Sequence, residues 1–161
     1  LLWAVRLALL AAVGVHVWAA TSLTLTNLRA RPRGYAEHAD VASTYASRTM
    51  VWSGPLLALF IGYHLAHLTL GWAGPRGFIP GDVYHNVVLG FRSPAVSALY
   101  SAAILALGLH LYHGVASMLQ TLGGSHPRWN GLRQGLAVLT ALLLVAGNLS
   151  FPLAVLSGLV R

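Results

Sequence analysis

QGLAVLTALLLVAGNLSFPLAVLSGLV, the run Gln134–Val160, decides the fold of this chain. The run includes no Asp, Glu, Lys or Arg. A helix of about 20 residues crosses the hydrocarbon core of a bilayer, which is ~30 Å thick. The run is therefore long enough for one crossing and too short for two, and it predicts a transmembrane helix.

Three further uncharged runs have the same character, namely Leu7–Leu28, Thr49–Pro75 and Ser93–Pro127. Hydrophobic residues make up 57% of the chain and charged residues only 8%. Soluble domains have about 25% charged residues, so a water-soluble fold is nearly excluded. We predict an all-α transmembrane helical bundle, one domain over 1–161. Its helices are expected at about 3–27, 48–72, 94–121 and 133–158.

Two prolines fall within the predicted helices. Pro55 is expected near the start of its helix, where a proline costs little. Pro152 is expected inside the last helix, where it should cause a kink.

The charges of the chain are strongly one-sided. All ten basic residues are Arg, against three acidic residues, which gives a formal net charge of +7. In a soluble protein this balance is typical of a nucleic-acid partner, but here the arginines flank apolar runs, as in membrane proteins. The face with the first and third loops has six arginines and the other face four, so the 29–48 loop is expected inside. Because the chain starts with Leu and enters its first helix at once, we expect one more helix on a preceding segment.

Histidine is the unusual residue type. The chain has no cysteine, which excludes disulfides, thiolate zinc sites, cysteine-held iron–sulfur clusters and thiol catalysis. Five of its eight histidines lie in the apolar runs, namely His16, His64, His67, His110 and His113. Three lie in loops as ordinary surface residues, namely His38, His85 and His126. A single membrane histidine is most simply a neutral imidazole bonded across helices, but five with almost no buried carboxylate indicate a prosthetic group.

Two of these histidines are predicted at the same depth. His16 precedes Arg29, the inner edge of its helix, by the same stretch of chain by which His110 precedes Gly123. At ~1.5 Å rise per residue, each is roughly 20 Å from the inner edge of its helix. Two imidazoles facing each other at one level can supply both axial ligands of a haem b iron.

The other membrane histidines allow more than one interpretation. His64 lies about 24 Å of helix beyond Arg48, slightly farther from the inner edge than His16 and His110 are. This difference in depth is small, so His64 can still pair with either of them. His67 and His113 lie one turn beyond His64 and His110. They can contact a haem propionate or a quinone, or simply bond to the next helix.

Several short motifs, spread over nearly the whole chain, occur in the same order and spacing as in one known protein family. They are His16-Val-Trp-Ala-Ala, Asn27-Leu-Arg-Ala-Arg-Pro, Thr44-Tyr-Ala-Ser-Arg-Thr-Met50, Trp52-Ser-Gly, His64-Leu-Ala-His-Leu-Thr69, Tyr84-His-Asn-Val-Val, His110-Leu-Tyr-His-Gly114 with Ser117, Gln120-Thr-Leu-Gly123, and Gly147 with Pro152. In these motifs the chain resembles the cytochrome b membrane-anchor subunit of succinate dehydrogenase (respiratory complex II). The chain resembles the form of this family in which a single anchor subunit has five helices and binds two haems. The similarity is strongest to the anchors of high-GC bacteria.

The resemblance implies haem ligands. The four predicted helices look like helices two to five of that family, because nothing here matches its first helix. Carried over by position, His16 and His110 are the axial ligands of the proximal haem iron, and His64 is one ligand of the distal haem iron. The partner of His64 is expected on the preceding segment, so the chain binds one or two haem b groups.

A quinone site is implied as well. Tyr45, Ser47 and Arg48 are expected at the inner interface, where a phenol, a hydroxyl and a guanidinium can bond a quinone carbonyl or a haem propionate. His113 is a candidate for the same contacts. The alternative is an outer quinone pocket under Asp82, Tyr84 and His85.

The resemblance further implies a subunit of an electron-transport complex of the tricarboxylic acid cycle, in the plasma membrane of a bacterium. Separate flavoprotein and iron–sulfur subunits on the cytoplasmic face oxidise succinate and pass electrons to haem and to menaquinone or another quinone. The chain itself is expected to have no catalytic residue and no nucleic-acid partner. A higher oligomer of the complex is left open.

Three rival interpretations remain. One is the haem b subunit of a membrane hydrogenase or formate dehydrogenase. Another is a haem-free anchor that only tethers soluble subunits. The third is a histidine-based transporter, which is disfavoured because the chain lacks the acidic residues of such pathways.

Overall fold

The computed structural model describes residues 1–30, 45–124 and 126–161, and for 45–47 the backbone only. Within these ranges all regular structure is helical, and four helices are long and apolar enough to cross a membrane. The all-α prediction is confirmed, and the chain is a multi-pass membrane protein. The observed α-helices match the expected bounds to within about one turn except at residues 65–69, where a π-helical turn replaces the end of the second expected helix.

The chain divides into two compact units, residues 1–41 and 42–161. The described part of the first unit is the helix α1 (Leu2–Ala30). Its apolar side chains are distributed around the whole circumference, as expected for a helix surrounded by lipid or by other apolar helices. His16 lies near its middle.

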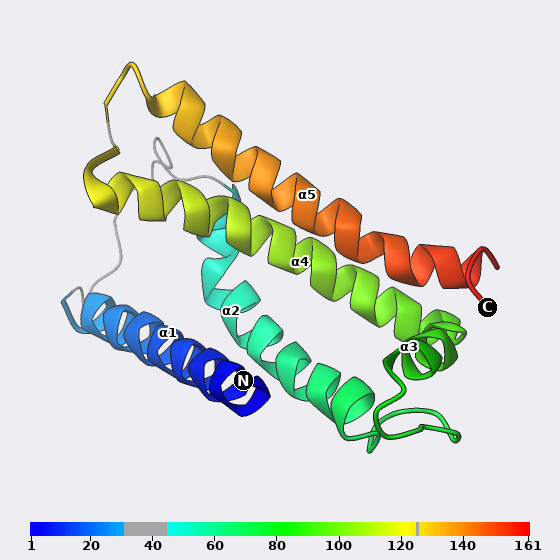
Figure 1. Ribbon diagram of the computed structural model, residues 1–161. Helices are drawn as coiled ribbons and strands as arrows, with labels where there is room; N and C mark the ends of the chain where they lie inside the picture. The colour runs from blue at the N-terminus through cyan, green and yellow to red at the C-terminus, as the bar shows by residue number, and fades with distance from the viewer. Residues whose placement is uncertain (31–44, 125) are drawn as a thin grey trace. The chain divides into compact units, whose positions relative to one another are not determined.

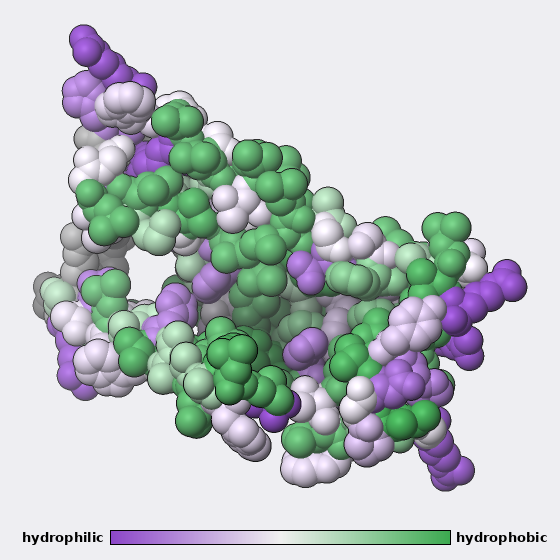
Figure 2. Space-filling model, viewed as in Figure 1, coloured by the Kyte–Doolittle hydropathy of each residue, from purple (hydrophilic) through white to green (hydrophobic). Residues whose placement is uncertain are grey.

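The second unit is built around one central helix. Its elements are α2 (Tyr45–His64), the π-helical turn η1 (Leu65–Thr69), α3 (Val83–Phe91), α4 (Pro94–Leu119), the π-helical turn η2 (Gln120–Gly124) and α5 (Asn130–Leu156). The central helix α4 packs against α2 on one side and runs beside α5 on the other (Figure 1). Figure 2 shows mostly hydrophobic side chains along α4 and α5 and hydrophilic ones at their two ends, which is the pattern of membrane-spanning helices.

The close packing of α4 on α5 depends on small residues. A Cβ atom at Gly108 of α4 would lie 2.5 Å from Cγ2 of Val145 on α5. Ala137 and Ala141 of α5 are buried as well. Small side chains let membrane helices approach closely. In lipid there is no hydrophobic driving force between helices, so the dispersion contacts of this close approach stabilise the pair.

An aromatic core lies where α2 ends and α4 begins. Phe91 of α3 meets Tyr100 of α4 edge to face, with ring centroids 4.9 Å apart. Phe60 of α2 meets the same tyrosine at 4.9 Å, and Val88 and Val155 complete the buried cluster. The core therefore joins α2, α3, α4 and α5 at one end of the unit.

The sequence did not predict α3. Asp82 caps its first turn, with Oδ1 accepting from the backbone N–H of His85 at 2.9 Å. The Asn86 side chain bonds both backbone groups of Ile79, at 2.9 and 2.7 Å, and so ties the preceding loop to the helix. A helix of this length is too short to appear as an apolar span.

Both helix prolines lie inside their helices. Pro152 lies inside α5, as predicted, and is fully buried. Pro55 also lies inside its helix, because α2 begins already at Tyr45, so the prediction that it lies near the helix start is wrong. Each proline removes one backbone N–H from its helix.

Candidate functional site

His110 of α4 is oriented by a serine from the neighbouring helix. Its Nδ1 lies 3.3 Å from Oγ of Ser53 on α2, and Ser53 is buried. A hydrogen bond at Nδ1 fixes the ring plane of a histidine, and most histidine ligands of metals are held in this way. The donor chemistry therefore fits an axial imidazole of a haem iron. The sequence analysis missed Ser53 as a functional residue, although it lies in the motif Trp52-Ser-Gly.

The pairing of His110 with His16 stays a prediction, because the two residues belong to different units. Each of them lies inside a helix that is long and apolar enough to span the membrane.

His64 is the last residue of α2, directly before η1. The residue is exposed on the described part of the chain, and its ring borders Phe60 and Tyr100, with centroid distances of 6.2 and 5.9 Å. An exposed imidazole beside an aromatic wall suits a ligand shared with a further helix. Its role at the distal haem stays a prediction.

His67, in contrast, has a structural role. It is 1% exposed, and its Nδ1 lies 2.9 Å from the hydroxyl oxygen of Tyr100 on α4. Its ring stacks on Tyr63 with a centroid distance of 5.5 Å. A Cβ atom at Gly90 would lie 2.8 Å from its Nε2, so α3 closes the other edge of the ring. Of the interpretations left open by the sequence, bonding to the next helix is the one observed.

His113 bonds within its own helix. Its Nε2 lies 3.1 Å from Oγ of Ser117. One turn further, Arg133 of α5 donates to Oε1 of Gln120 at 2.9 Å and to the carbonyl of Ala116 at 3.3 Å. A polar strip thus lies near the end of α4, and the predicted contact of His113 with a propionate or quinone stays a prediction.

The stretch expected to bind a quinone at the inner interface forms the first turn of α2. The side chains of Tyr45 and Ser47 lie outside the described residues, as does His38. Arg48 is exposed. Their roles stay predictions.

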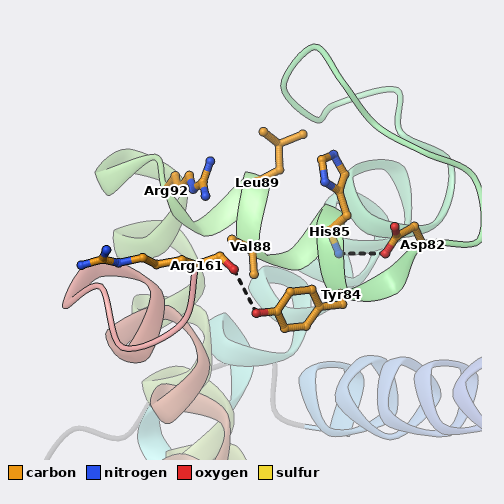
Figure 3. Close-up of a pocket in the computed structure, with 7 residues that line it drawn as sticks. All are labelled: Asp82, Tyr84, His85, Val88, Leu89, Arg92 and Arg161. Carbon is orange, nitrogen blue, oxygen red and sulfur yellow. Dashed lines mark hydrogen bonds between the residues drawn. The ribbon is translucent and has the colours of Figure 1, made fainter.

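A cavity of about 330 Å³ adjoins α3, and we call it the α3 cavity. Its lining residues are Asp82, Tyr84, His85, Val88, Leu89, Arg92 and Arg161 (Figure 3). The Tyr84 hydroxyl donates to the carbonyl of Arg161 at 3.0 Å, so the end of the described chain is tied to α3. Asp82, Tyr84 and His85, the residues of the alternative quinone pocket, all line this cavity, and their role toward a quinone stays a prediction.

The cavity changes the interpretation of three residues. His85 is not an ordinary loop residue, because it lies on α3, is half-buried and has Nε2 2.9 Å from the carbonyl oxygen of Gly77. Arg92 and Arg161 were counted only as flanking charges, yet both line the cavity. Their convergence depends on α3, which the sequence did not predict.

No cluster of three or more His, Asp or Glu side chains that could hold a metal ion occurs among the described residues. No known protein family matches the chain, and neither the curated proteins nor the solved structures include a significantly similar one. The class that the fold defines is a multi-pass, all-α membrane protein.

Proposed function

We propose that this chain is the haem b-binding membrane anchor of a succinate:quinone oxidoreductase in a bacterial plasma membrane. The observation that supports the proposal best is the Ser53–His110 hydrogen bond, because it orients an imidazole inside a membrane span as a metal ligand is oriented. The family resemblance and the matching depth of His16 add to it.

The residues present fit the prosthetic group. His16 and His110 would hold the iron of a proximal haem, and His64 would hold one side of a distal one. Haem b, when bound, supplies one-electron transfer. The chain's own contribution is to hold neutral imidazoles in fixed orientation, with Ser53 fixing that of His110, and to exclude water through the apolar faces of α2 and α4.

The partner subunits are proposed to dock where α2 begins and α4 ends. Arg48 and Arg128 are exposed at this end. If this end is cytoplasmic, as the arginine distribution indicates, a flavoprotein and an iron–sulfur subunit deliver electrons from succinate here. Tyr45, Ser47 and Arg48 are the proposed contacts of menaquinone or another quinone.

The test is the absorption spectrum and composition of the isolated complex. We expect a haem b alpha band in the dithionite-reduced minus oxidised spectrum, together with a co-purifying flavin-containing subunit that oxidises succinate. A second haem per anchor would indicate a further helix. A spectrum without the band would leave only a tethering role, and a nickel or molybdenum partner would assign the chain to another quinone-linked enzyme.

A further inference from the structure

The geometry points to a second ligand site: we propose that the α3 cavity binds the phosphate of an anionic membrane lipid. This site is independent of the haem proposal, since it requires only that α4 and α5 span the membrane.

Two cations from different elements converge on the cavity. Arg92 directly follows α3, and Arg161 follows α5. The Arg92 guanidinium makes no hydrogen bond or ion pair with any described residue, and Arg161 donates only its Nε, to the carbonyl of Gly158 at 3.1 Å. Figure 3 shows both arginines on one side of the cavity and Asp82 on the opposite side. The Asp82 carboxylate caps α3, and within the described residues it forms no ion pair with either arginine.

The cavity lies at the depth of lipid headgroups. The spanning helix α4 begins at Pro94, just after Arg92, and α5 ends at Leu156, just before Arg161. The ends of spanning helices coincide with the boundary between hydrocarbon and headgroups. Arginine at this boundary offers planar, bidentate donors that match phosphate oxygens.

The lining combines polar donors with an apolar wall, as a phosphate with acyl chains requires. Five of the seven lining residues carry polar or charged groups. Val88 and Leu89 give the cavity one apolar wall. Leu153 and Leu156 at the end of α5 are exposed, as is Leu159 just beyond it, and they provide a surface for acyl chains.

Tyr84 positions one of the cations. Its hydroxyl bonds the carbonyl of Arg161, which attaches that residue to α3. Loss of this bond would release Arg161 from the cavity without changing the charge. Tyr84→Phe therefore separates the geometry of the site from its net charge.

Native mass spectrometry of the full-length protein in a neutral detergent tests the proposal, with phosphatidylglycerol and phosphatidylcholine as probes. We expect preferential retention of phosphatidylglycerol. Arg92→Gln should weaken this retention about fivefold, the factor that corresponds to ~1 kcal/mol per basic residue at an anionic lipid surface. Arg92→Lys should weaken it less, and Tyr84→Phe should weaken it as well. Arg76→Gln is the matched control, because Arg76 is exposed but does not line the cavity.

Several outcomes would overturn the proposal. Equal retention of the two lipids would do so, as would an Arg92→Gln variant that behaves like Arg76→Gln. Displacement of the lipid by inorganic phosphate at equal concentration would show a site for free phosphate instead. If Arg92→Gln removed a haem spectral component and left lipid retention unchanged, the arginines would serve haem carboxylates.

Discussion

The imidazole Nδ1 of His67 lies 2.9 Å from the hydroxyl oxygen of Tyr100, and this bond ties the turn η1 to α4. The histidine is stacked on Tyr63 and closed in by Gly90 of α3. Its neighbour His64, one turn earlier, is exposed. The same helix end thus presents one histidine to the core and one to its surroundings, and the second is the one proposed as a haem ligand.

Tyr100→Phe removes the interhelical hydrogen bond while keeping the ring. Such bonds between membrane helices contribute ~0.6 kcal/mol on average and up to ~1.7 kcal/mol. We expect a loss of stability near ~1 kcal/mol, because both partners are buried. This loss of stability is measured by unfolding the solubilised protein with increasing amounts of a denaturing detergent. Tyr112→Phe, on a half-buried tyrosine of the same helix, is the control. Equal stability of both variants would show that the bond contributes nothing.

Gly90→Ala is expected to lower the stability of the protein more than the addition of a single methyl group usually does. The new Cβ would lie 2.7 Å from Cε1 of His67, a ring held by two neighbours. Overpacking of this kind costs about 1–3 kcal/mol. Gly114→Ala is the control, since nothing lies within 4 Å of a Cβ atom there. In the same unfolding assay, Gly90→Ala should be much less stable than Gly114→Ala. The opposite order of stability would contradict the packing of Gly90 against His67.

Ser53→Ala tests the orientation of His110. Removing an outer-shell partner of a histidine ligand typically lowers metal affinity about 10–100-fold. We expect the variant to lose haem more readily during purification and to shift the potential of one haem component. Ser150→Ala is the control, because Ser150 is exposed and bonds only Gly147 of its own helix. An unchanged potential and haem content in Ser53→Ala would refute the role of this serine.

The predicted ligand pairs are tested by removing single histidines. His16→Ala and His110→Ala should abolish the same spectral component, since each would remove one of the two axial ligands proposed for one haem iron. His64→Ala should abolish a different component. His126→Ala, on an exposed residue, should leave the spectrum intact. Reduced-minus-oxidised spectra distinguish the components, and identical spectra for the three ligand variants would refute the assignment.

The spans could be predicted from the sequence, whereas the contacts between helices could not. The run Gln134–Val160 already indicated α5 to within one turn. The roles of His67 and Ser53 depend instead on how α2 is rotated against α4. Spanning helices are apolar on nearly all faces, so hydrophobic periodicity does not reveal which face is turned inward.

The α3 cavity could not be predicted from the sequence for a related reason. Asp82, Tyr84 and His85 were noted as a group, but the two arginines that share their cavity are separated from one another by the whole of α4 and α5. Only the return of the chain to the same end of the unit brings Arg92 and Arg161 together.

The amino-acid order alone determined that the described part of the chain includes four helices long and apolar enough to cross a membrane, because an uncharged apolar stretch of that length suits the hydrocarbon core. It also determined which polar groups are placed inside the bilayer. The tertiary structure alone decided which of those groups are satisfied by a neighbouring helix and which are directed outward. The reason is that hydrogen bonds and close packing act over a few ångströms between residues that are distant along the chain.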